Sequence, residues 1–474
     1  MPRISLVWFR NDLRLHDNVV LHEAIQKSQQ VYPVYCFDPR QFAETEIGEP
    51  KTGPFYANFL LESVAELRHN LQKLGSDLIV RQGIPENVIS QLAKETGAMA
   101  VYASKEAASD EVAVEAALER NLNTLGIELE LAWQSTLFHI DDIPWPIKNL
   151  PDIFSQFRKE AEHSVKVRAI TPTPTQLNAL DTVNVGLIPT LDDLGLSLPS
   201  HDPRAALHYQ GGETAGKERL QSYFWDHDLL PIYKETRNGL LGADYSSKFS
   251  AWLANGSLSP RVIYQEVRRY ESERVKNKST YWLIFELLWR DYFRFIAKKY
   301  GSRIFQTSGI RQEEPYLRDD WGAFEKWKTG NTGVPFIDAN MREINASGYM
   351  SNRGRQNVAS FLVKDLKVNW TWGAAYFESK LIDYDVCSNW CNWNYVAGVG
   401  NDPRENRYFN IMSQAQRYDP QGEYVRHWIA ELSHVEGKRV HYPTEIPTEE
   451  LASLGVVIGE DYPRPLVGFN KWLY

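Results

Sequence analysis

A short segment near residue 390 combines side chains that could bind a ligand. Within Leu381–Tyr395, the residues Asp385, Asn389 and Trp393 recur every four positions. On a helix this spacing stacks a carboxylate, an amide and an indole in one line, and Asp383 lies two residues earlier. Such a mixture predicts a site for a large planar heterocycle.

Two other kinds of catalytic site do not fit this segment. Cys387 and Cys391 have no second cysteine pair, and no histidine stands at ligand spacing, so we predict no metal site. No Gly-x-Ser-x-Gly motif occurs, and no serine is paired with a histidine in a pattern typical of nucleophilic catalysis.

A carboxylate interrupts an aromatic surface in the segment Tyr281–Asp291. Trp282, Glu286 and Trp289 share one helical face with the following Phe293. A carboxylate among apolar side chains costs several kcal/mol unless it is paired or bound to a ligand. Two interpretations remain open here: an internal Glu–Arg ion pair, or a carboxylate that faces a ligand.

Polar side chains also gather at the predicted start of a helix at Ser351. Asn352, Arg355 and Gln356 share one face there, and Arg353 lies to the side. These groups could line the same ligand site. The alternative is a solvated first turn, because such side chains are usually exposed.

Hydroxyl groups precede another apolar helix. Ser246, Ser247 and Ser250 lie just before or at the start of Ala251-Trp-Leu-Ala. Hydroxyls and free backbone N–H groups at a helix start can bind an anion such as a phosphate. The alternative is that Ser247 only caps the helix.

The elements that must position these segments fall into two domains. Strand and helix patterns alternate over residues 1–135, which predicts a doubly wound α/β domain with a parallel sheet. The expected strands and helices are Ile4–Phe9, Val31–Phe37, Leu78–Val80, Met99–Ala103 and Glu128–Trp133, and Pro54–Leu74, Glu86–Lys94 and Asp110–Leu125.

Residues 136–210 form a connecting segment and linker, which is rich in proline from residue 164 onward. Residues 211–474 are predicted to be a large all-α domain, in which strand signals nearly vanish. Its expected helices are Pro260–Val275, Tyr281–Lys299, Gly333–Asn345, Ser351–Leu366 and Trp372–Leu381. Twelve of the 15 tryptophans follow residue 200, so the second domain makes special use of indoles.

Composition limits the class of protein. The 474 residues are 43% hydrophobic and 24% charged, which excludes a disordered or fibrous chain. The net charge of −9 argues against a wholly basic surface but allows one local nucleic-acid groove. Three cysteines without a disulfide framework indicate a reducing compartment such as the cytoplasm. We see no targeting or membrane-spanning segment.

The four segments together resemble the photolyase/cryptochrome flavoproteins, as do Val7-Trp-Phe-Arg-Asn-Asp-Leu-Arg14 and Asp461-Tyr-Pro-Arg-Pro465. The resemblance covers nearly the whole chain and is strongest to DASH-type cryptochromes. It implies an antenna domain over residues 1–135 and an FAD-binding domain over residues 211–474. It also implies a blue-light-driven lyase that repairs cyclobutane pyrimidine dimers in DNA, and we expect a monomer.

The resemblance assigns the cofactor site residue by residue. Tyr233, Ser246, Ser247 and Ser250 would hold the phosphates and ribose of FAD. The residues that would line its ring system are Arg290, Asn352, Asp383, Asp385 and Asn389, with Arg355 paired to Asp383. Leu283 stands where photolyases often place a tryptophan against the flavin.

An electron relay is also implied. Trp393 and Trp370 match its inner and middle members. The position of the outer member falls on Leu317, and Tyr316 or Trp321 could take that role.

The substrate site follows from the same resemblance. Glu286 would hydrogen-bond the dimer, Trp289 would stack on the flipped bases, and Arg237 and Arg353 would bind flanking phosphates. Gln356 and Tyr395 replace the methionine and tryptophan of duplex-acting photolyases. A less apolar pocket compensates less of the unpairing energy, so we expect a preference for single-stranded DNA.

Two points remain alternatives. The chain could instead be a blue-light photoreceptor that binds DNA and signals through flavin reduction. The expected antenna is 5,10-methenyltetrahydrofolate, bound between the domains, with Glu106, Asp110 or Glu111 as the folate-binding acid.

Overall fold

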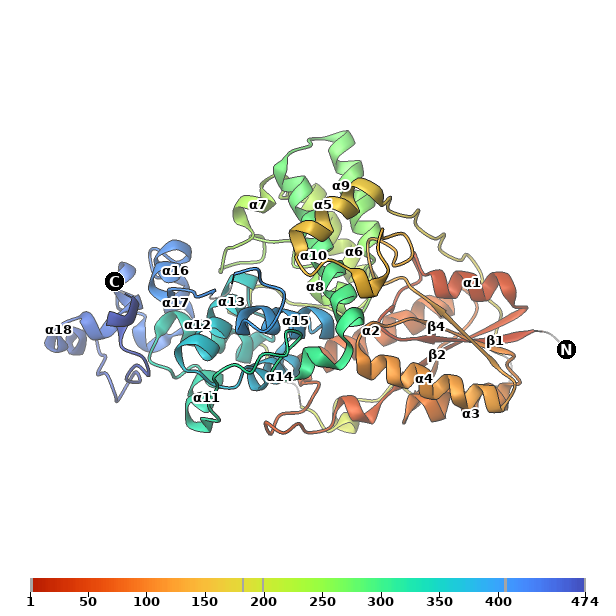
Figure 1. The fold of residues 1–474 in the computed structure, drawn as a ribbon, viewed down its shortest axis with the longest axis horizontal. Helices are drawn as coiled ribbons and strands as arrows, with labels where there is room; N and C mark the ends of the chain where they lie inside the picture. Colours follow the sequence, from red (N-terminus) through yellow and green to blue (C-terminus); the bar gives the residue numbers. More distant parts are fainter. Residues whose placement is uncertain (1–2, 181–182, 198–199, 405–406, 473–474) are drawn as a thin grey trace.

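The computed structural model describes residues 3–180, 183–197, 200–404 and 407–472. An α/β domain and a larger helical domain lie next to each other along the long axis of the molecule (Figure 1). The predicted fold class is therefore confirmed.

The first domain is built on a five-stranded parallel sheet with the order β3-β2-β1-β4-β5. The strands are Ile4–Phe9 (β1), Gln30–Phe37 (β2), Ile79–Gln82 (β3), Ala100–Ser104 (β4) and Glu128–Ala132 (β5). Alternate side chains of β1 enter opposite layers: Val7 and Phe9 pack on one side, and Leu6 and Trp8 on the other. The central strand β1 and its neighbour β2 are nearly continuous buried runs because both of their faces are covered.

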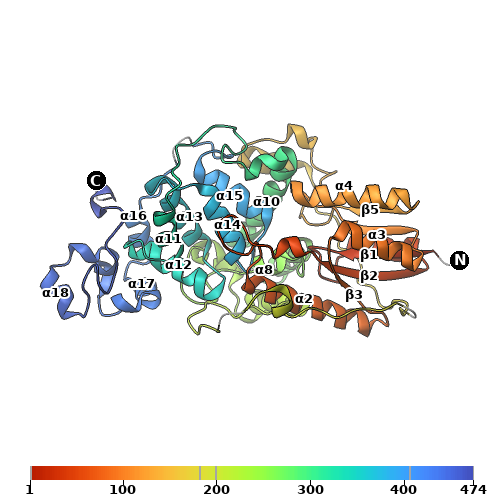
Figure 2. The same cartoon turned by 90° about the horizontal axis from the view of Figure 1, so that it is seen from below.

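Helices cover both faces of this sheet (Figure 2). Side chains of α1 (Val19–Lys27) and α2 (Pro54–Lys73) complete one layer of the core, and those of α3 (Pro85–Thr96) and α4 (Ser109–Thr124) complete the other. Helix α1 was not predicted. It buries only three side chains and depends on its N-cap, Asn18, whose side chain accepts a hydrogen bond from the Leu21 amide.

The helical domain surrounds α10, which packs against α7, α9 and α15 and against α5 (Phe154–Ser164) of the connecting segment. Its helices are α6 (Glu213–Gln221), α7 (Tyr233–Thr236), α8 (Ser250–Ala254), α9 (Pro260–Glu273), α10 (Lys278–Tyr300), α11 (Trp321–Lys328), α12 (Pro335–Ser347), α13 (Asn352–Ser360), α14 (Trp370–Lys380), α15 (Val386–Ala397), α16 (Ile411–Tyr418), α17 (Glu423–Trp428) and α18 (Thr448–Ser453). The predicted helix Ser351–Leu366 is divided, because a π-helical turn, Phe361–Asp365, follows α13. In the described part of the chain, no helix has the length and apolar character needed to cross a membrane.

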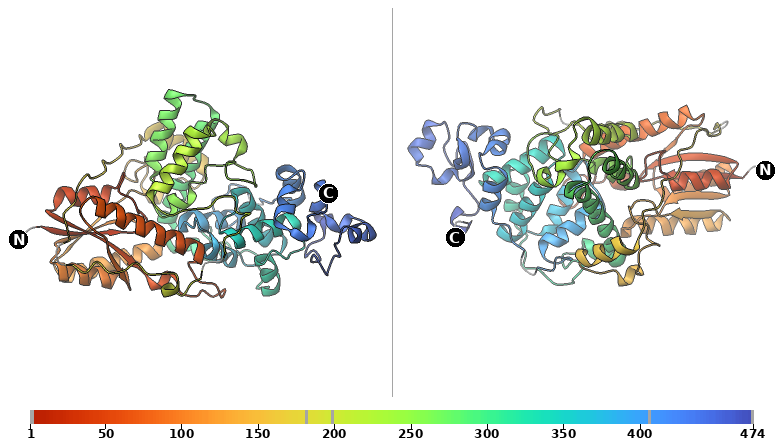
Figure 3. Two further views of the ribbon diagram at one scale, coloured as in Figure 1. Left: turned by 180° about the vertical axis from the view of Figure 1, so that it is seen from behind. Right: turned by 90° about the horizontal axis from the view of Figure 1, so that it is seen from above.

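The connecting segment contains one helix that sequence patterns did not reveal, α5 (Phe154–Ser164). It packs on α10 (Figure 3). There the ring of Phe154 stacks on that of Trp289, with 3.6 Å between the centroids. The linker beyond it runs back along the first domain. There the amide of Val80 on the edge strand β3 donates a 2.7 Å hydrogen bond to the Val185 carbonyl.

Polar contacts fix the two domains together. Asp291 on α10 accepts hydrogen bonds from the amides of Leu137 (2.9 Å) and Phe138 (2.8 Å), just after the last strand. The buried side chain of Asp17 forms a 2.6 Å ion pair with Arg261 on α9. The sheet and the helices around α10 therefore share a polar as well as an apolar interface.

Candidate functional site

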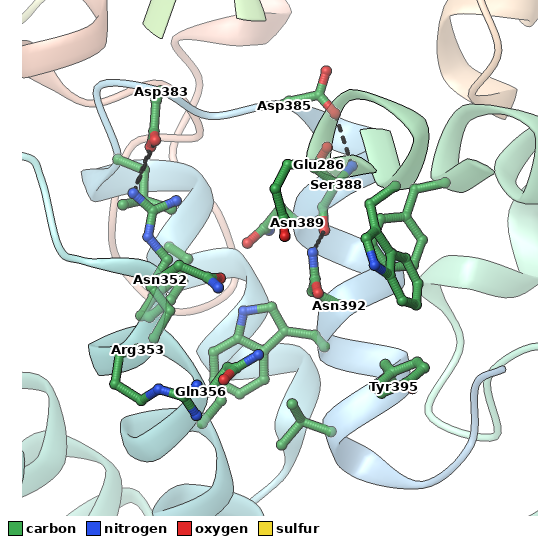
Figure 4. A pocket seen from close by; sticks show the side chains of 18 of the residues that line it. Glu286, Asn352, Arg353, Gln356, Asp383, Asp385, Ser388, Asn389, Asn392 and Tyr395 are labelled. Carbon is green, nitrogen blue, oxygen red and sulfur yellow. Dashed lines mark hydrogen bonds and ion pairs between the residues drawn. The ribbon is translucent and has the colours of Figure 1, made fainter. Parts of the chain in front are cut away.

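A cavity of about 390 Å³ lies in the helical domain, among α10, α13, α14 and α15 (Figure 4). Carboxylates, amides and guanidinium groups line it together with aromatic rings. The lining residues are Arg237, Phe285, Glu286, Trp289, Phe293, Asn352, Arg353, Arg355, Gln356, Ala359, Phe377, Leu381, Asp383, Asp385, Ser388, Asn389, Asn392, Trp393, Tyr395, Val396, Arg404 and Arg407. The structure thus brings the three polar segments of the sequence to one place.

Helix α15 presents the predicted line of side chains to the cavity. Asp385 is its N-cap and accepts a 2.7 Å hydrogen bond from the Ser388 amide. Asn389 follows one turn later and donates to the Ala374 carbonyl on α14. Trp393 fits because α14 has a glycine opposite it: a Cβ on Gly373 would lie 2.3 Å from the indole. The close approach of α14 and α15 therefore sets the wall of the cavity.

Asp383 and Arg355 form an ion pair of 2.9 Å, which confirms their predicted pairing. Arg355 also donates to the Met350 carbonyl. Burial favours a lower pKa for the Arg355 guanidinium, but the Asp383 carboxylate outweighs this effect and leaves that pKa raised. For Arg355, the alternative of a solvated first turn is wrong.

A second ion pair was missed by sequence reasoning. Arg294 on α10 donates to both oxygens of Asp385, at 3.2 Å from Nη1 to Oδ1. Burial favours a higher pKa for Asp385, yet the charges of Arg294 and Arg290 and the bonds from Ser388 hold this pKa below its usual value. The signal for Arg294 was its position one helical turn after Arg290.

Arg290 itself binds backbone carbonyls outside the lining of this cavity. Its guanidinium donates to the carbonyls of Ser135 and Leu253, and it is not among the residues that line the cavity. Four residues along α10 separate it from Arg294, so the two side chains share a face of the helix but reach different partners. The arginine in direct contact with Asp385 is Arg294.

Glu286 both pairs with an arginine and lies at the cavity, so neither of the two interpretations of its sequence excludes the other. Its Oε1 lies 2.6 Å from Nη1 of Arg237, so it has an arginine partner. That oxygen nevertheless has no partner with hydrogen-bond geometry, and the side chain remains 27% exposed at the cavity wall. Burial raises the pKa of Glu286, while Arg237 acts in the opposite direction. Glu286 can therefore still bond to a ligand.

The other predicted substrate residues also meet at this cavity. Trp289 lies edge-on to Tyr395, with the ring centroids 6.1 Å apart. The Oε1 atom of Gln356 is buried without a hydrogen-bond partner. Arg353 donates to the side chain of Asn238 and lies over the Tyr418 ring.

Several predicted cofactor residues lie outside the described lining. They are Tyr233, which is buried, Ser246, Ser247, Ser250 and the buried Leu283. Trp370, predicted as the middle member of the electron relay, is also buried outside this lining. The alternative that Ser247 caps a helix is wrong, because α8 begins at Ser250 after Phe249.

The serine turn is shaped by one arginine. Arg219 on α6 donates hydrogen bonds to the carbonyls of Ala243, Ser246 and Ser247. Because these carbonyl oxygens accept hydrogen bonds from a cation, their partial negative charge is offset. They therefore repel less strongly an anion that approaches the serine hydroxyls.

Two further arginines at the mouth of the cavity were not predicted. Arg404 and Arg407 both form ion pairs with the buried Asp402, at 3.1 and 3.5 Å. Arg407 also lies over the ring of Tyr395, 5.3 Å from its centroid. Their position directly after the Tyr395 segment, beyond a glycine-rich turn, could have indicated them.

The donor set fits a flavin. Amides and paired carboxylates can bond the edge of a polar heterocycle, and Phe377 and Trp393 supply an apolar wall. The buried Oε1 atom of Gln356, which has no hydrogen-bond partner, shows that the side chains alone do not satisfy the cavity. The cavity therefore suits a planar ligand with its own hydrogen-bond donors.

Comparisons with known proteins agree with this site. The family described as the FAD binding domain of DNA photolyase matches residues 282–472, and the family described as DNA photolyase matches residues 5–177. The chain is 55% identical to cryptochrome DASH of Gloeobacter violaceus over 98% of its length and 92% of that protein. It is 53% identical to cryptochrome DASH of a Synechocystis species over 99% of its length and 96% of that protein.

Solved structures are similar over the full length. A crystal structure of a Synechocystis cryptochrome has a TM-score of 0.97 at 53% identity, covering 100% of this chain and 98% of that one. A class III photolyase from Agrobacterium tumefaciens has a TM-score of 0.86 at 29% identity, covering 99% and 95%.

The ion pair at the start of α15 gives a prediction about stability. In Arg294→Met, Asp385 loses its cation while it stays buried, so the free energy of unfolding should fall by about 3–5 kcal/mol at pH 7. In the wild type, the folded protein holds the pKa of Asp385 below its usual value. The ionised carboxylate therefore stabilises the fold at neutral pH, and this stabilisation is lost as the pH falls through the lowered pKa.

Without Arg294, burial should raise the pKa of Asp385, and protonation should then relieve the penalty. The deficit of Arg294→Met relative to the wild type should therefore shrink between pH 7 and pH 4. Denaturant unfolding at both pH values measures this deficit. The control is Arg269→Met, which breaks the exposed ion pair of Arg269 with Glu273 on α9. An equal deficit for both variants at pH 7 would contradict the role of Arg294.

Proposed function

Because the chain belongs to the photolyase/cryptochrome family and is a cryptochrome DASH within it, we propose that it repairs cyclobutane pyrimidine dimers with blue light. We propose further that FAD occupies the cavity of the helical domain and that single-stranded DNA is the preferred substrate. The observation that carries this proposal is the convergence of Glu286, Trp289 and two cavity arginines beside the buried Arg355–Asp383 pair.

FAD, when bound, supplies the one-electron chemistry that light drives. The residues around the cavity would orient it: Asn352 and Asn389 would offer amides, and the Arg355–Asp383 pair would place a compensated charge beside the ring system. Tyr233 and the serines at 246, 247 and 250 would bind its phosphates and ribose. The hydrogen bonds from Arg219 to the carbonyls of this turn support that role, because they place a positive charge beside the serines.

The open side of the cavity suits a flipped pyrimidine pair. Trp289 and Tyr395 present ring faces and edges there, and stacking on aromatic side chains stabilises an extruded base. Arg237, Arg353 and the two arginines at 404 and 407 lie around the same opening, where they can bind flanking phosphates.

Binding of DNA would change the partner of Glu286. A phosphate that recruits Arg237 takes away the cation that lowers the pKa of Glu286. Burial then favours the protonated carboxyl, which can donate a hydrogen bond to a carbonyl of the dimer. In this way substrate binding prepares the acid that the repair reaction needs.

The preference for single strands rests on two polar positions. Gln356 keeps an unbonded oxygen in the cavity wall, and the phenol ring of Tyr395 is smaller than an indole. A pocket with these groups offers less apolar contact to the flipped bases, so less of the cost of opening a duplex is recovered.

We propose further that the protein binds 5,10-methenyltetrahydrofolate as an antenna chromophore between the two domains. Glu106 and Glu111 lie at this boundary, and burial raises the pKa of both carboxyl groups. The negative charge of Glu106 also contributes to the pKa of Glu111, which is raised to about 7. Oε2 of Glu111 is buried without a partner. Asp110 is largely exposed, which favours the two glutamates as ligands of a pterin ring.

Repair of a dimer in oligothymidine tests the proposed enzyme. Under blue light the wild type should repair the single strand faster than the same dimer in a duplex. Glu286→Ala should lower the single-strand rate about 10²-fold because it removes the proton donor, and Glu286→Gln should retain more because its amide can donate. Glu273→Gln, on the exposed surface of α9, is the control.

Equal rates on single-stranded and duplex DNA would contradict the substrate preference. A chain that is reduced by light but leaves the dimer intact would favour the photoreceptor alternative.

Absorbance tests the antenna. Protein reconstituted with 5,10-methenyltetrahydrofolate should gain a violet absorption band that FAD alone does not give. Glu106→Gln and Glu111→Gln should weaken folate retention, because each removes a carboxyl that faces the boundary, whereas Asp110→Asn should keep it. Loss of the band only in Asp110→Asn would contradict this assignment.

A further inference from the structure

One face of α10 carries aromatic rings where a surface helix normally carries polar groups. Between positions 282 and 289 the buried side chains of this helix are all aliphatic, whereas Trp282, Phe285, Glu286 and Trp289 are partly exposed. An amphipathic helix usually turns charged and polar side chains to its exposed side. Contiguous aromatic surface of this kind is typical of a binding site.

Trp282 extends this aromatic face beyond the cavity. Phe285 and Trp289 line the cavity, and Trp282 does not. The Trp282 ring stacks on Phe285, with 4.5 Å between the centroids and 27° between the planes. The proposed dimer site gives Trp289 a function and leaves Trp282 without one. A flat aromatic surface therefore continues from the cavity toward the start of α10.

Two cations in and just after α7 lie over the Trp282 ring. Nζ of Lys234 is 4.6 Å from the ring centroid, and the guanidinium carbon of Arg237 is 5.9 Å from it. Arg237 is paired with the cavity carboxylate Glu286. Lys234 forms no ion pair with any residue that the structure describes. Its positive charge is therefore available to an anion outside the cavity.

Hydrogen bonds to the start of α10 fix α7 beside this ring. The amide of Lys234 donates to Oγ of Ser279 at 3.1 Å, and this hydroxyl donates to Glu235 at 2.6 Å. Asn277, the N-cap of α10, donates to the Pro231 carbonyl at 2.9 Å. The carboxylate next to Lys234 is thus bonded to a serine, and the lysine is held beside Trp282 by the fold itself.

An indole beside an unpaired cation matches the chemistry of one nucleotide. Proteins that bind single strands combine aromatic side chains, on which bases stack, with cations that follow the phosphates. A base stacks on an indole more strongly than an ammonium group interacts with an exposed ring. An incoming base would therefore displace the Lys234 ammonium from the Trp282 ring, and this ammonium would then be free to pair with the phosphate.

We propose that Trp282 and Lys234 bind the nucleotide next to the dimer when the DNA is single-stranded. This inference rests on the proposed function, because the dimer must occupy the cavity. The neighbouring base stacks on Trp282, and Lys234 pairs with its phosphate. In a duplex this base is held by its partner, so it reaches Trp282 only if a further base pair opens. The nucleotide site therefore favours single strands independently of Gln356 and Tyr395.

Binding in the dark to oligothymidine that contains one dimer tests this site. The strand is used complete, with an abasic nucleotide directly 5′ of the dimer, with an abasic nucleotide directly 3′ of it, and as a duplex. The FAD-loaded proteins are the wild type, Trp282→Ala, Lys234→Gln and the matched control Trp225→Ala. Trp225 is also a partly exposed indole beside a cation, 4.6 Å from Arg269, but it does not adjoin the cavity lining.

Trp282→Ala should bind the complete single strand about tenfold more weakly than the wild type and the duplex equally well, because only the unpaired base loses its stacking partner. In the wild type, one of the two abasic strands should show the same loss, and in Trp282→Ala that strand should show no further loss.

Lys234→Gln should make the slope of log affinity against log salt shallower by about 0.7, the value for one phosphate contact of a single strand. Trp225→Ala should match the wild type throughout. The abasic strands and Lys234→Gln test the site even if Trp282→Ala fails to take up FAD.

Two results would overturn the nucleotide site alone. One is a wild type that binds both abasic strands as tightly as the complete strand. The other is a Trp282→Ala variant whose affinity falls equally for single strand and duplex, which is the sign of a purely structural role. A FAD-loaded wild type that does not distinguish dimer-containing from undamaged oligothymidine would overturn the proposed function, and this site with it.

Discussion

The arrangement of the helical domain depends on pairing carboxylates with arginines where little water reaches them. Arg355 balances Asp383, and Arg294 balances Asp385, at the head of the same helix. A buried charge that loses its partner costs several kcal/mol, so each pair constrains the helices that carry it. The pairs fix α10, α13 and α15 relative to one another. The cavity is the space that this constraint leaves between them.

The same constraint explains why polar groups line a cavity in an apolar core. Once the ion pairs are satisfied among themselves, the amides of Asn352 and Asn389 and the oxygen of Gln356 remain available to a ligand. Glycine at 373 lets the indole of Trp393 close one wall. A flavin in this place would meet fixed dipoles and compensated charges, which is how a protein directs a cofactor with its own reactivity.

Sequence patterns predicted the sheet, most clearly β1 and β2, because these buried parallel strands are short apolar runs rich in β-branched and aromatic residues. They missed α1 and α5, whose few apolar positions become significant only when a sheet or α10 is there to pack against. The Asp383–Arg355 pair could be predicted from the resemblance. The Asp385–Arg294 pair could not, because Arg290 and Arg294 have the same helical phase and only tertiary packing distinguishes their partners.

Binding of FAD to the chain, measured by absorbance and equilibrium titration, tests this account most directly. The account predicts a yellow complex with one FAD per chain. It also predicts affinity about 10²-fold weaker in Asp383→Asn, where Arg355 keeps its charge without a partner. A chain that stays colourless with excess FAD, or an Asp383→Asn variant that binds FAD as tightly as the wild type, would contradict it.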